Sequence, residues 1–443
     1  MPSSPDRGWP ARQILYVAIL IAAGYALTLA IFYPGVMTYD AKFVYEDIAK
    51  GVLGDWQSPV MTVLWGLIDP VAPGAASMFL LIATTYWLGF GLLAMAVVHR
   101  SGRLAIALPL LALVPPAFVF VGVIWRDVLF ATTWLLAAAI AFSVAGRDLR
   151  LRAPAQALAL GLCALGVLLR PNALIAAPIL AVYIAWPEQM SWKRTAILFV
   201  PAMAGFFVLV QGIYYGALGA TRQHPLHSIM VFDLGGISHF TKQNQFPVTW
   251  SEPEAALLLN SCYQPTQWDI YWRLEPCDFV MRKLEREERL FGTSAVTEAW
   301  AHAVIRHPLA YLRHRAAFTW NFLGGNNLTM WVADIEQPTG TVFSDRPAFV
   351  ALVALHDALK PTLLFRAGSW LLFCIAVCGF AWRRRETVDG AFALGVCGSA
   401  AVYVLTFSAI GVASDFRYVY WAVLAGIVGG AVTAPGRSRP RPL

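Results

Sequence analysis

The feature of this sequence that most constrains its fold is a series of apolar segments about as long as a bilayer core is thick. A helix needs about 20 mostly apolar residues to cross that core. Only 13% of the 443 residues are charged and 58% are hydrophobic, whereas about 25% are charged in a soluble domain. We therefore predict an all-α polytopic membrane protein with about ten transmembrane helices. The candidate spans are 12–32, 74–98, 104–124, 127–146, 154–169, 172–186, 195–216, 364–382, 389–411 and 418–433.

Two of these segments leave the topology open at one place. Only Arg170-Pro171 separates 154–169 from 172–186, so the pair forms either two short spans or one broken hairpin. The apolar run at 59–70 is too short to span and is expected at the interface. The first run is longer than the core of a typical signal peptide, and we interpret it as a span, with cleavage near Ala30 as the alternative.

The charged residues divide the chain into three parts. Residues 217–350 hold 24 of the 59 charged residues, which indicates an aqueous insert within a membrane protein. We predict an N-terminal membrane domain (1–216), a mainly helical extracytoplasmic insert (217–360) and C-terminal membrane helices with a basic cytoplasmic tail (361–443). Within the insert, helices are expected at 275–291 and 294–307. The stretch 309–323 mixes aromatic and basic residues, which favours a helix in the headgroup layer with Arg313 and Arg315 near lipid headgroups.

The basic residues between the spans indicate how the protein is oriented. If the N-terminus is cytoplasmic, the inner loops and tail carry fifteen Lys and Arg residues, and the short outer loops carry five. Such a bias marks the cytoplasmic side. It accounts for the net charge of +7 without nucleic acid as a partner. The Ala/Arg/Gly-rich composition suggests a bacterial inner membrane, with the outer loops facing the periplasm.

The six cysteines fit this orientation. Four lie inside predicted spans, where a thiol behaves as a small apolar group. Cys262 and Cys277 lie in the outer insert, 15 positions apart. Because extracytoplasmic segments are in an oxidising environment, we predict a disulfide between them, with two unpaired thiols as the alternative.

Four short outer segments place ionisable residues at the membrane boundary. Charges there are costly, and each is a candidate for a functional role. The segments are Tyr33-Pro34-Gly35-Val36-Met37-Thr38-Tyr39-Asp40, Trp125-Arg126-Asp127, Arg170-Pro171-Asn172 and Ser414-Asp415-Phe416-Arg417-Tyr418.

Together these segments offer carboxylates and guanidinium groups at one depth. The planar fork of Arg126, Arg170 and Arg417 suits phosphate oxygens, and a phosphate at the membrane surface implies a lipid phosphate. A carboxylate such as Asp40 or Asp127 can accept the proton of a hydroxyl nucleophile. This combination suits glycosyl transfer from a lipid-phosphate sugar, because the arginines stabilise the charge that develops on the leaving phosphate.

The same segments resemble the polyprenyl-phosphate-sugar glycosyltransferases of the GT-C superfamily. The similarity lies in YPGVMTYDAKFVYEDIAKG and DWQSPV after the first span, WRDVLFA, LRPNALI, HPLAYLRHR and DFRYVY. It implies that Asp40 corresponds to the catalytic carboxylate of the first outer loop and Asp127 to the acidic position of the second. It also implies inversion at the anomeric carbon and a bilayer-embedded donor site that opens to the outer face.

The chain departs from the family pattern in two respects. The second outer loop is too short for a long Glu-x-Asp motif, and no acceptor domain is evident beyond the insert. Metal dependence and acceptor class therefore stay open: no cofactor is certain, a divalent metal is possible but not indicated, and the acceptor is a glycan, a lipid or a protein.

Each candidate residue also has a structural interpretation. Asp40 suits the N-cap of the next helix, and Asp127 is placed to pair with Arg126 or to cap the span that follows. Arg126 is also placed to snorkel to headgroups, and Arg417 to pair with Asp415.

Further candidates lie in the first outer loop and in the insert. Trp56 and Gln57 are candidates for the cavity lining, although tryptophan is common at interfaces. The insert begins with His224, His227, Asp233 and His239, a set of histidines and a carboxylate that is a weak signal for zinc. Contact of one of these histidines with the sugar or the acceptor is the alternative.

Two other functions remain open. One is a polysaccharide polymerase or ligase that uses a lipid-diphosphate glycan and acts through arginines and a histidine of the insert. The other is a lipid-linked-glycan flippase or transporter. The sequence has no phosphate-binding loop of the kind that drives ATP-powered pumps, and it shows one broken segment rather than the paired breaks of many secondary transporters.

Overall fold

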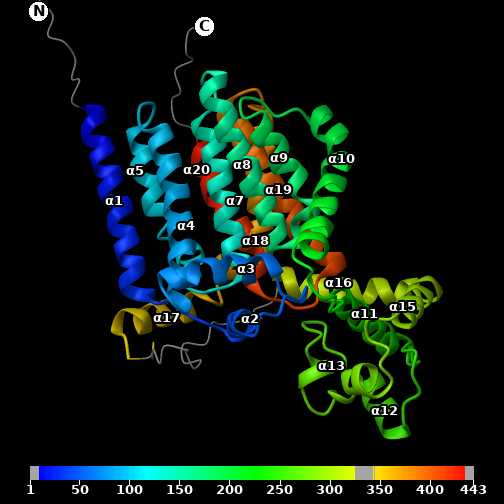
Figure 1. Ribbon diagram of the computed structural model, residues 1–443. Coiled ribbons are helices and arrows are strands. Elements are labelled where there is room, and N and C mark those ends of the chain that lie inside the picture. The colour runs from blue at the N-terminus through cyan, green and yellow to red at the C-terminus, as the bar shows by residue number, and fades with distance from the viewer. Residues whose placement is uncertain (1–8, 325–342, 344, 435–443) are drawn as a thin grey trace, which may run out of the picture.

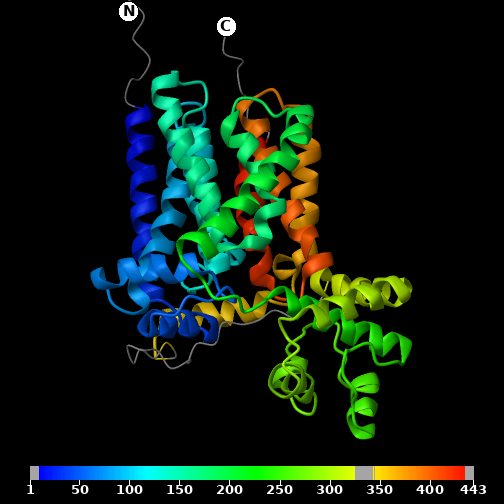
Figure 2. The ribbon, with the colours of Figure 1, turned by 45° about the vertical axis from the view of Figure 1, so that its right-hand side comes forward.

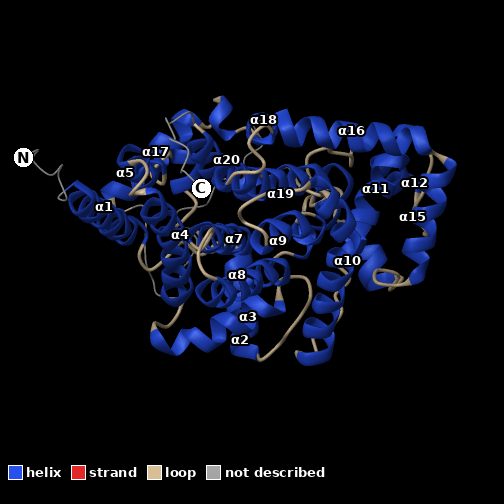
Figure 3. Cartoon of the chain, turned by 90° about the horizontal axis from the view of Figure 1, so that it is seen from above, coloured by secondary structure: helices blue, strands red, loops and turns tan. Residues whose placement is uncertain are grey.

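The chain folds as a helical bundle with a second group of helices across one of its ends. The computed structural model describes residues 9–324, 343 and 345–434. Within these residues the regular structure is helical, apart from three isolated β-bridges, as Figure 3 also shows. The predicted all-α membrane class is confirmed.

The bundle contains the elements predicted as spans (Figures 1 and 2). Seven helices are long and apolar enough to cross a bilayer, by length and composition, in the described part of the chain. They are α1 (Trp9–Phe32), α4 (Ala75–Val97), α7 (Arg126–Ser143), α8 (Leu149–Leu169), α10 (Trp192–Gln211) with the π-helical turn Gly212–Ala217, α19 (Val388–Ile410) and α20 (Tyr420–Thr433) with the preceding turn Phe416–Val419. The shorter α5 (Gly102–Leu111), α9 (Ala177–Ala185) and α18 (Ala367–Trp382) stand among them.

Helices at one end of the bundle run across it rather than along it. They are α2 (Tyr39–Lys50), α3 (Pro59–Ile68), α16 (Pro308–Gly324) and α17 (Pro347–Leu359). Beyond them project α11 (Leu226–Thr241), α12 (Glu252–Asn260), α13 (Ile270–Arg273), α14 (Phe279–Met281) and α15 (Ser294–Arg306). The loops that join α4 to α5, α7 to α8, α9 to α10 and α18 to α19 lie at the opposite end. The basic loops therefore share one end, and the insert and the first outer loop share the other.

Prolines explain where the helices differ from the predictions. The single span expected at 104–124 is wrong: α5 ends at Leu111 and a short α6 (Pro115–Phe118) follows, because Pro115 and Pro116 lack the amide donors that would extend the helix. The helix expected at 275–291 is present but shorter, since after Pro276 only α14 and the π-helical turn Arg282–Glu287 are helical. Between α8 and α9 the chain turns through a 3-10 helix, Pro171–Ile175, so the two helices form separate arms of the bundle.

Tryptophan side chains on the interior helices form hydrogen bonds to neighbouring helices of the bundle. Trp134 on α7 donates its indole N–H to the Cys163 carbonyl of α8, 3.0 Å away. Its ring lies so close to Gly166 that a Cβ there would stand 2.1 Å from the indole nitrogen. Trp87 likewise donates to Thr28 at 2.9 Å. Because lipid offers no hydrogen-bond partners, these internal bonds satisfy polar ring atoms within the bundle.

Candidate active site

The first outer segment pairs with the second and so brings Asp40 beside Arg126. The Val36 amide donates to the Gly122 carbonyl at 2.8 Å, and the Ile124 amide donates to the Val36 carbonyl at 3.0 Å. The N-cap of α2 is Thr38, so Asp40 lies in the first helical turn and does not cap the helix. This pairing sets α2 against the start of α7.

Asp40 forms an ion pair with an arginine from the far end of the chain. Its Oδ2 lies 2.6 Å from Nη1 of Arg417. Arg417 also contacts Asp415, whose Oδ2 is 2.9 Å from its Nε. The Arg417 side chain is 16% exposed and that of Asp40 is 38% exposed. Arg417 thus has both the local partner that its sequence suggests and a distant one, and Asp40 stays accessible.

The second ion pair lies deeper in the protein. Nε of Arg170 is 2.9 Å from Oδ1 of Asp127, and the side chains are only 6% and 4% exposed. Asp127 therefore pairs with Arg170 rather than with its neighbour Arg126. The ring of Tyr418 joins the two ion pairs, because the guanidinium carbons of Arg170 and Arg417 lie 4.9 and 5.4 Å from its centroid.

Arg126 lies at the mouth of this cluster and is held by the loop after α2. Its Nη1 donates to the Trp56 carbonyl at 3.1 Å. The Trp56 amide in turn donates to the Gln223 side chain at 2.9 Å. A small hollow opens here. Its lining residues are Asp40, Ala41, Val44, Gln57, Met61, Ile124, Trp125, Arg126 and Asp127.

The arginines control the charge of the exposed carboxylate. Burial alone would raise the pKa of Asp40, but Arg417 and then Arg126 outweigh it and hold the pKa of that carboxyl below its usual value. A nearby cation favours the ionised form of a carboxyl group. Asp40 is therefore an anion at neutral pH.

The structure thus brings together the candidates from all four outer segments. Asp40, Asp127, Arg126, Arg170 and Arg417 form one cluster through the contacts above. The cluster lies at the bundle end that carries the insert, where α7 and α20 begin and α8 ends (Figure 1). Trp56 touches the cluster through its carbonyl oxygen, and Gln57 lines the hollow.

A second cluster of buried ionic groups lies in the insert and was not predicted. Asp233 on α11 lies 2.7 Å from Nη2 of Arg315 and 3.2 Å from Nε2 of His314. Trp300 donates its indole N–H to the same carboxylate at 2.8 Å. The expectation that Arg315 contacts headgroups is wrong, because its side chain is 6% exposed. Arg313, two residues away, is exposed. The available signal was a lone carboxylate in an apolar helix, which needs a buried partner.

Arg315 connects this cluster to the segment that carries Arg417. Its Nη1 donates to the Gly411 carbonyl at 2.7 Å, and Gly411 caps the C-terminus of α19. The insert segment that begins at Cys262 gives a second support to this region. A disulfide closes the segment by joining Cys262 to Cys277, whose Cα atoms lie 5.6 Å apart.

Of the three histidines at the start of the insert, His224 and His227 are neighbours and His239 packs elsewhere. His227 accepts a hydrogen bond from the Gly292 amide at 3.0 Å, and its ring centroid lies 5.5 Å from that of His224. His239 instead stacks on Tyr263 at 4.7 Å. Among the residues that the structure describes, no group of three or more His, Cys, Asp or Glu side chains is arranged to hold a metal ion.

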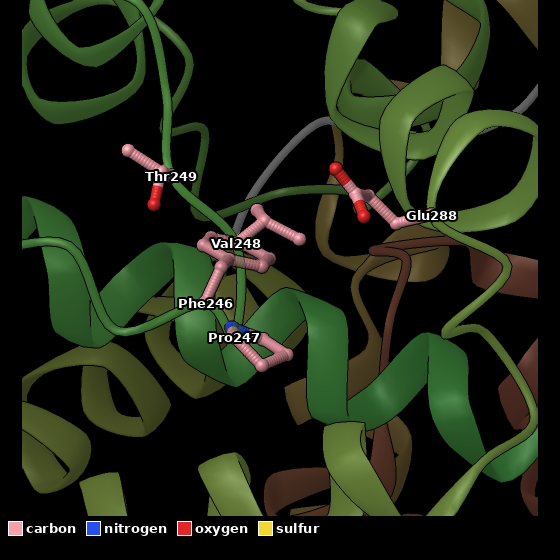
Figure 4. A pocket seen from close by; sticks show the side chains of 5 residues that line it. All are labelled: Phe246, Pro247, Val248, Thr249 and Glu288. Carbon is pink, nitrogen blue, oxygen red and sulfur yellow. The ribbon is translucent and has the colours of Figure 1, made fainter.

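Another hollow lies on the insert. It is lined by Phe246, Pro247, Val248, Thr249 and Glu288 (Figure 4). Its one ionisable lining residue is a carboxylate, so these five residues do not suit a phosphate group.

Comparisons with known proteins give distant matches only. No protein-family model matches the sequence, and no curated protein matches it. Two solved structures match it, both at low identity and low TM-score. One is the apo oligosaccharyltransferase of Archaeoglobus fulgidus, with 14% identity and a TM-score of 0.37 over 94% of this chain and 50% of that one. The other is ArnT of Cupriavidus metallidurans bound to undecaprenyl phosphate, with 14% identity and a TM-score of 0.35 over 94% of this chain and 77% of that one. The chain thus spans half the length of the oligosaccharyltransferase.

Proposed function

We propose that this membrane protein transfers a sugar from a polyprenyl-phosphate donor to an acceptor hydroxyl at the outer face of the membrane. The observation that carries the proposal is the 2.6 Å ion pair between Asp40 and Arg417 at the edge of a hollow that Arg126 also lines. A general base beside guanidinium groups at the membrane boundary is the minimum that this reaction needs.

In the proposed reaction Asp40 is the general base. The acceptor oxygen attacks the anomeric carbon, the bond from that carbon to the phosphate oxygen breaks, and the acceptor proton passes to Asp40. A single displacement of this kind inverts the anomeric centre. Because Arg417 holds Asp40 in the resting protein, an incoming phosphate competes for the guanidinium group and releases the carboxylate when the donor is in place.

The arginines differ in how directly they can reach a phosphate. Arg126 is partly exposed, and within the described residues its side chain donates one hydrogen bond, to the Trp56 carbonyl, which leaves donors for phosphate oxygens. Arg417 offers the second guanidinium group. Arg170 is buried against Asp127, so we assign it a longer-range electrostatic role. Asp127 then positions Arg170, and Asp40 is the better placed of the two carboxylates to act as the base.

The test is the Asp40→Asn variant, which keeps the shape of the side chain and removes its basicity. Membranes with and without the protein are first compared by mass spectrometry for the addition of one hexose- or pentose-sized unit to a lipid or glycan. The variant should abolish that product and still bind undecaprenyl phosphate in lipid nanodiscs. Retained turnover would favour the polymerase or ligase hypothesis, and substrate movement without a new glycosidic bond would favour a transporter.

A further inference from the structure

A disulfide-closed segment of the insert is fixed against the edge of the candidate active site. The disulfide joins Cys262 to Cys277. Between them, the Trp268 amide donates to the Val412 carbonyl at 2.8 Å, and the Thr266 carbonyl accepts from the Ser414 amide at 2.7 Å. The residues that follow Ser414 lead directly to Arg417. This segment therefore has a fixed position relative to the charged cluster.

Three tryptophans extend from the cluster along this segment. The rings of Trp56 and Trp268 lie 5.8 Å apart, and those of Trp268 and Trp272 are stacked at 6.3 Å with an interplanar angle of 24°. The row begins at the active site, because the carbonyl oxygen of Trp56 accepts a hydrogen bond from Arg126. Trp268 is 6% exposed and Trp272 is 40% exposed. The row thus runs from the reacting region to one exposed ring, that of Trp272.

Charged groups flank the outer tryptophan and fix its ring. Trp272 donates its indole N–H to Asp269 at 3.3 Å, and Asp269 lies 2.8 Å from Nη2 of Arg273. An exposed aromatic ring with a carboxylate and a guanidinium group beside it combines an apolar face with hydrogen-bonding groups at its edge. Small-molecule sites pair aromatic surface with a few placed polar groups in this way.

We propose that Trp272, held in place by the row of Trp268 and Trp56 behind it, forms the subsite for a saccharide acceptor, an inference that rests on the proposed glycosyl transfer. A sugar ring has an apolar face of C–H groups, which packs on an aromatic ring, and hydroxyls at its rim, which the Asp269 and Arg273 pair can bind. A lipid acceptor would need apolar surface at the bilayer boundary, whereas α13 carries Trp272 in the part of the insert that projects away from the bundle (Figure 1). The acceptor class this favours is a glycan.

Saturation-transfer NMR tests this subsite without any turnover. The protein is placed in lipid nanodiscs, since sugar-headed detergents would compete, and is mixed with free maltose, cellobiose and xylobiose. The native protein should transfer saturation to the ring protons of at least one disaccharide. Trp272→Ala should weaken that binding by about tenfold, and Trp272→Phe should restore part of it. The matched control is Trp320→Ala, an 80% exposed tryptophan of the same insert, which should bind as the native protein does.

The outcomes separate this proposal from the function on which it rests. Absence of signal from all three sugars, equal binding by Trp272→Ala and the native protein, or an equal loss in Trp320→Ala would each overturn the subsite. Undecaprenyl phosphate binding, measured on the same samples, should be unchanged in all variants. If Asp40→Asn kept its turnover while Trp272→Ala lost sugar binding, the sugar site would stand and the proposed mechanism would fail.

Discussion

Asp40 and Arg417 lie 377 positions apart in the chain, and their side chains meet at 2.6 Å. The contact joins the first outer loop to the last. Among the carboxylates of the charged cluster, Asp40 is the only one whose side chain is more than a third exposed. An ion pair of this kind has two effects that can be measured separately, one on the ionisation of Asp40 and one on the binding of phosphate.

The first prediction concerns the pH dependence of the Arg417→Gln variant. Arg417 is the strongest influence that lowers the pKa of Asp40, so its removal should raise that pKa and move the acidic limb of the pH–rate profile to higher pH. Turnover at the optimum should fall by about 10²- to 10³-fold, because the developing phosphate charge loses a donor. Arg417→Lys should restore the pKa more fully than the turnover, since an ammonium group is a point charge without the planar fork.

The same shift affects stability in a defined direction. In the folded protein the pKa of Asp40 lies below its ordinary value, so the ionised form stabilises the fold. That stabilisation is present above the ordinary pKa of about 3.9 and is lost as the pH falls through the lowered value. An acidic limb that stays in place in Arg417→Gln would contradict the role of this ion pair.

The second prediction concerns the buried pair of Asp127 and Arg170. Asp127→Asn leaves the guanidinium group of Arg170 without its counter-charge at a site that is 6% exposed. Removal of one partner of a buried pair costs about 3–5 kcal/mol, so the unfolding temperature in detergent should fall markedly. The double variant Asp127→Leu with Arg170→Leu removes both charges and should regain much of that loss. If Asp127→Asn were as stable as the native protein, the pair would not be buried as described.

The third prediction concerns Arg315 as a positioning residue. Its bond to the Gly411 carbonyl holds the start of the segment that carries Arg417, so Arg315→Met should lower turnover about 10- to 100-fold by misplacing that arginine. Arg315→Met should also move the acidic limb of the pH–rate profile to higher pH, by less than Arg417→Gln does. Arg313→Met is the matched control, because Arg313 is exposed on the same helix.

A companion variant separates positioning from folding. Arg315→Met alone leaves Asp233 buried without its closest cation. Asp233→Asn combined with Arg315→Met removes that unpaired charge and should recover thermal stability, while turnover stays low. Recovery of both properties would show that Arg315 acts only on stability.

From the amino-acid sequence, the residues that form the charged cluster could be predicted better than the ion pairs that they form with one another. The apolar runs and the basic loops placed Asp40, Arg126, Arg170 and Arg417 at one depth, because span length and sidedness are properties of local composition. Which carboxylate meets which guanidinium group depends on how the ends of α7, α8 and α20 pack. Sequence neighbours suggested a pair of Arg126 with Asp127, whereas the structure pairs Asp127 with Arg170.

The insert was the part least accessible from sequence. Asp233 and Arg315 are 82 positions apart in a chain with no family model to relate them. The alternating aromatic and basic pattern at 309–323 gave no sign that one arginine of α16 faces inward. In the membrane part, the proline pair at 115–116 ended a helix that hydrophobicity alone extended to residue 124, since apolar composition does not register the loss of backbone donors.

The fourth prediction concerns the disulfide. The bridge between Cys262 and Cys277 has a sequence separation of 15, and closure of a loop of that size is worth about 3 kcal/mol in the chain-entropy model. Cys262→Ser with Cys277→Ser should therefore make the insert more sensitive to limited proteolysis and should lower turnover, because the bridged segment braces residues 412–414. Reduction with dithiothreitol should reproduce these effects in the native protein and change nothing in the double variant. An effect of the reductant on the double variant would place the sensitivity elsewhere.

The fifth prediction concerns which side of the membrane carries the site. Ala49 on α2 and Leu149 at the start of α8 are both exposed and lie at opposite ends of the bundle (Figure 1). The excess of basic residues near Leu149 predicts that this end is cytoplasmic. In intact bacterial spheroplasts, a membrane-impermeant maleimide should therefore label Ala49→Cys, and it should label Leu149→Cys only after the cells are lysed. The native protein gives the background, because three of its four free cysteines are buried and the fourth is partly buried. Labelling of Leu149→Cys in intact spheroplasts, with Ala49→Cys protected, would put the Asp40 and Arg417 pair on the cytoplasmic side and exclude transfer at the outer face.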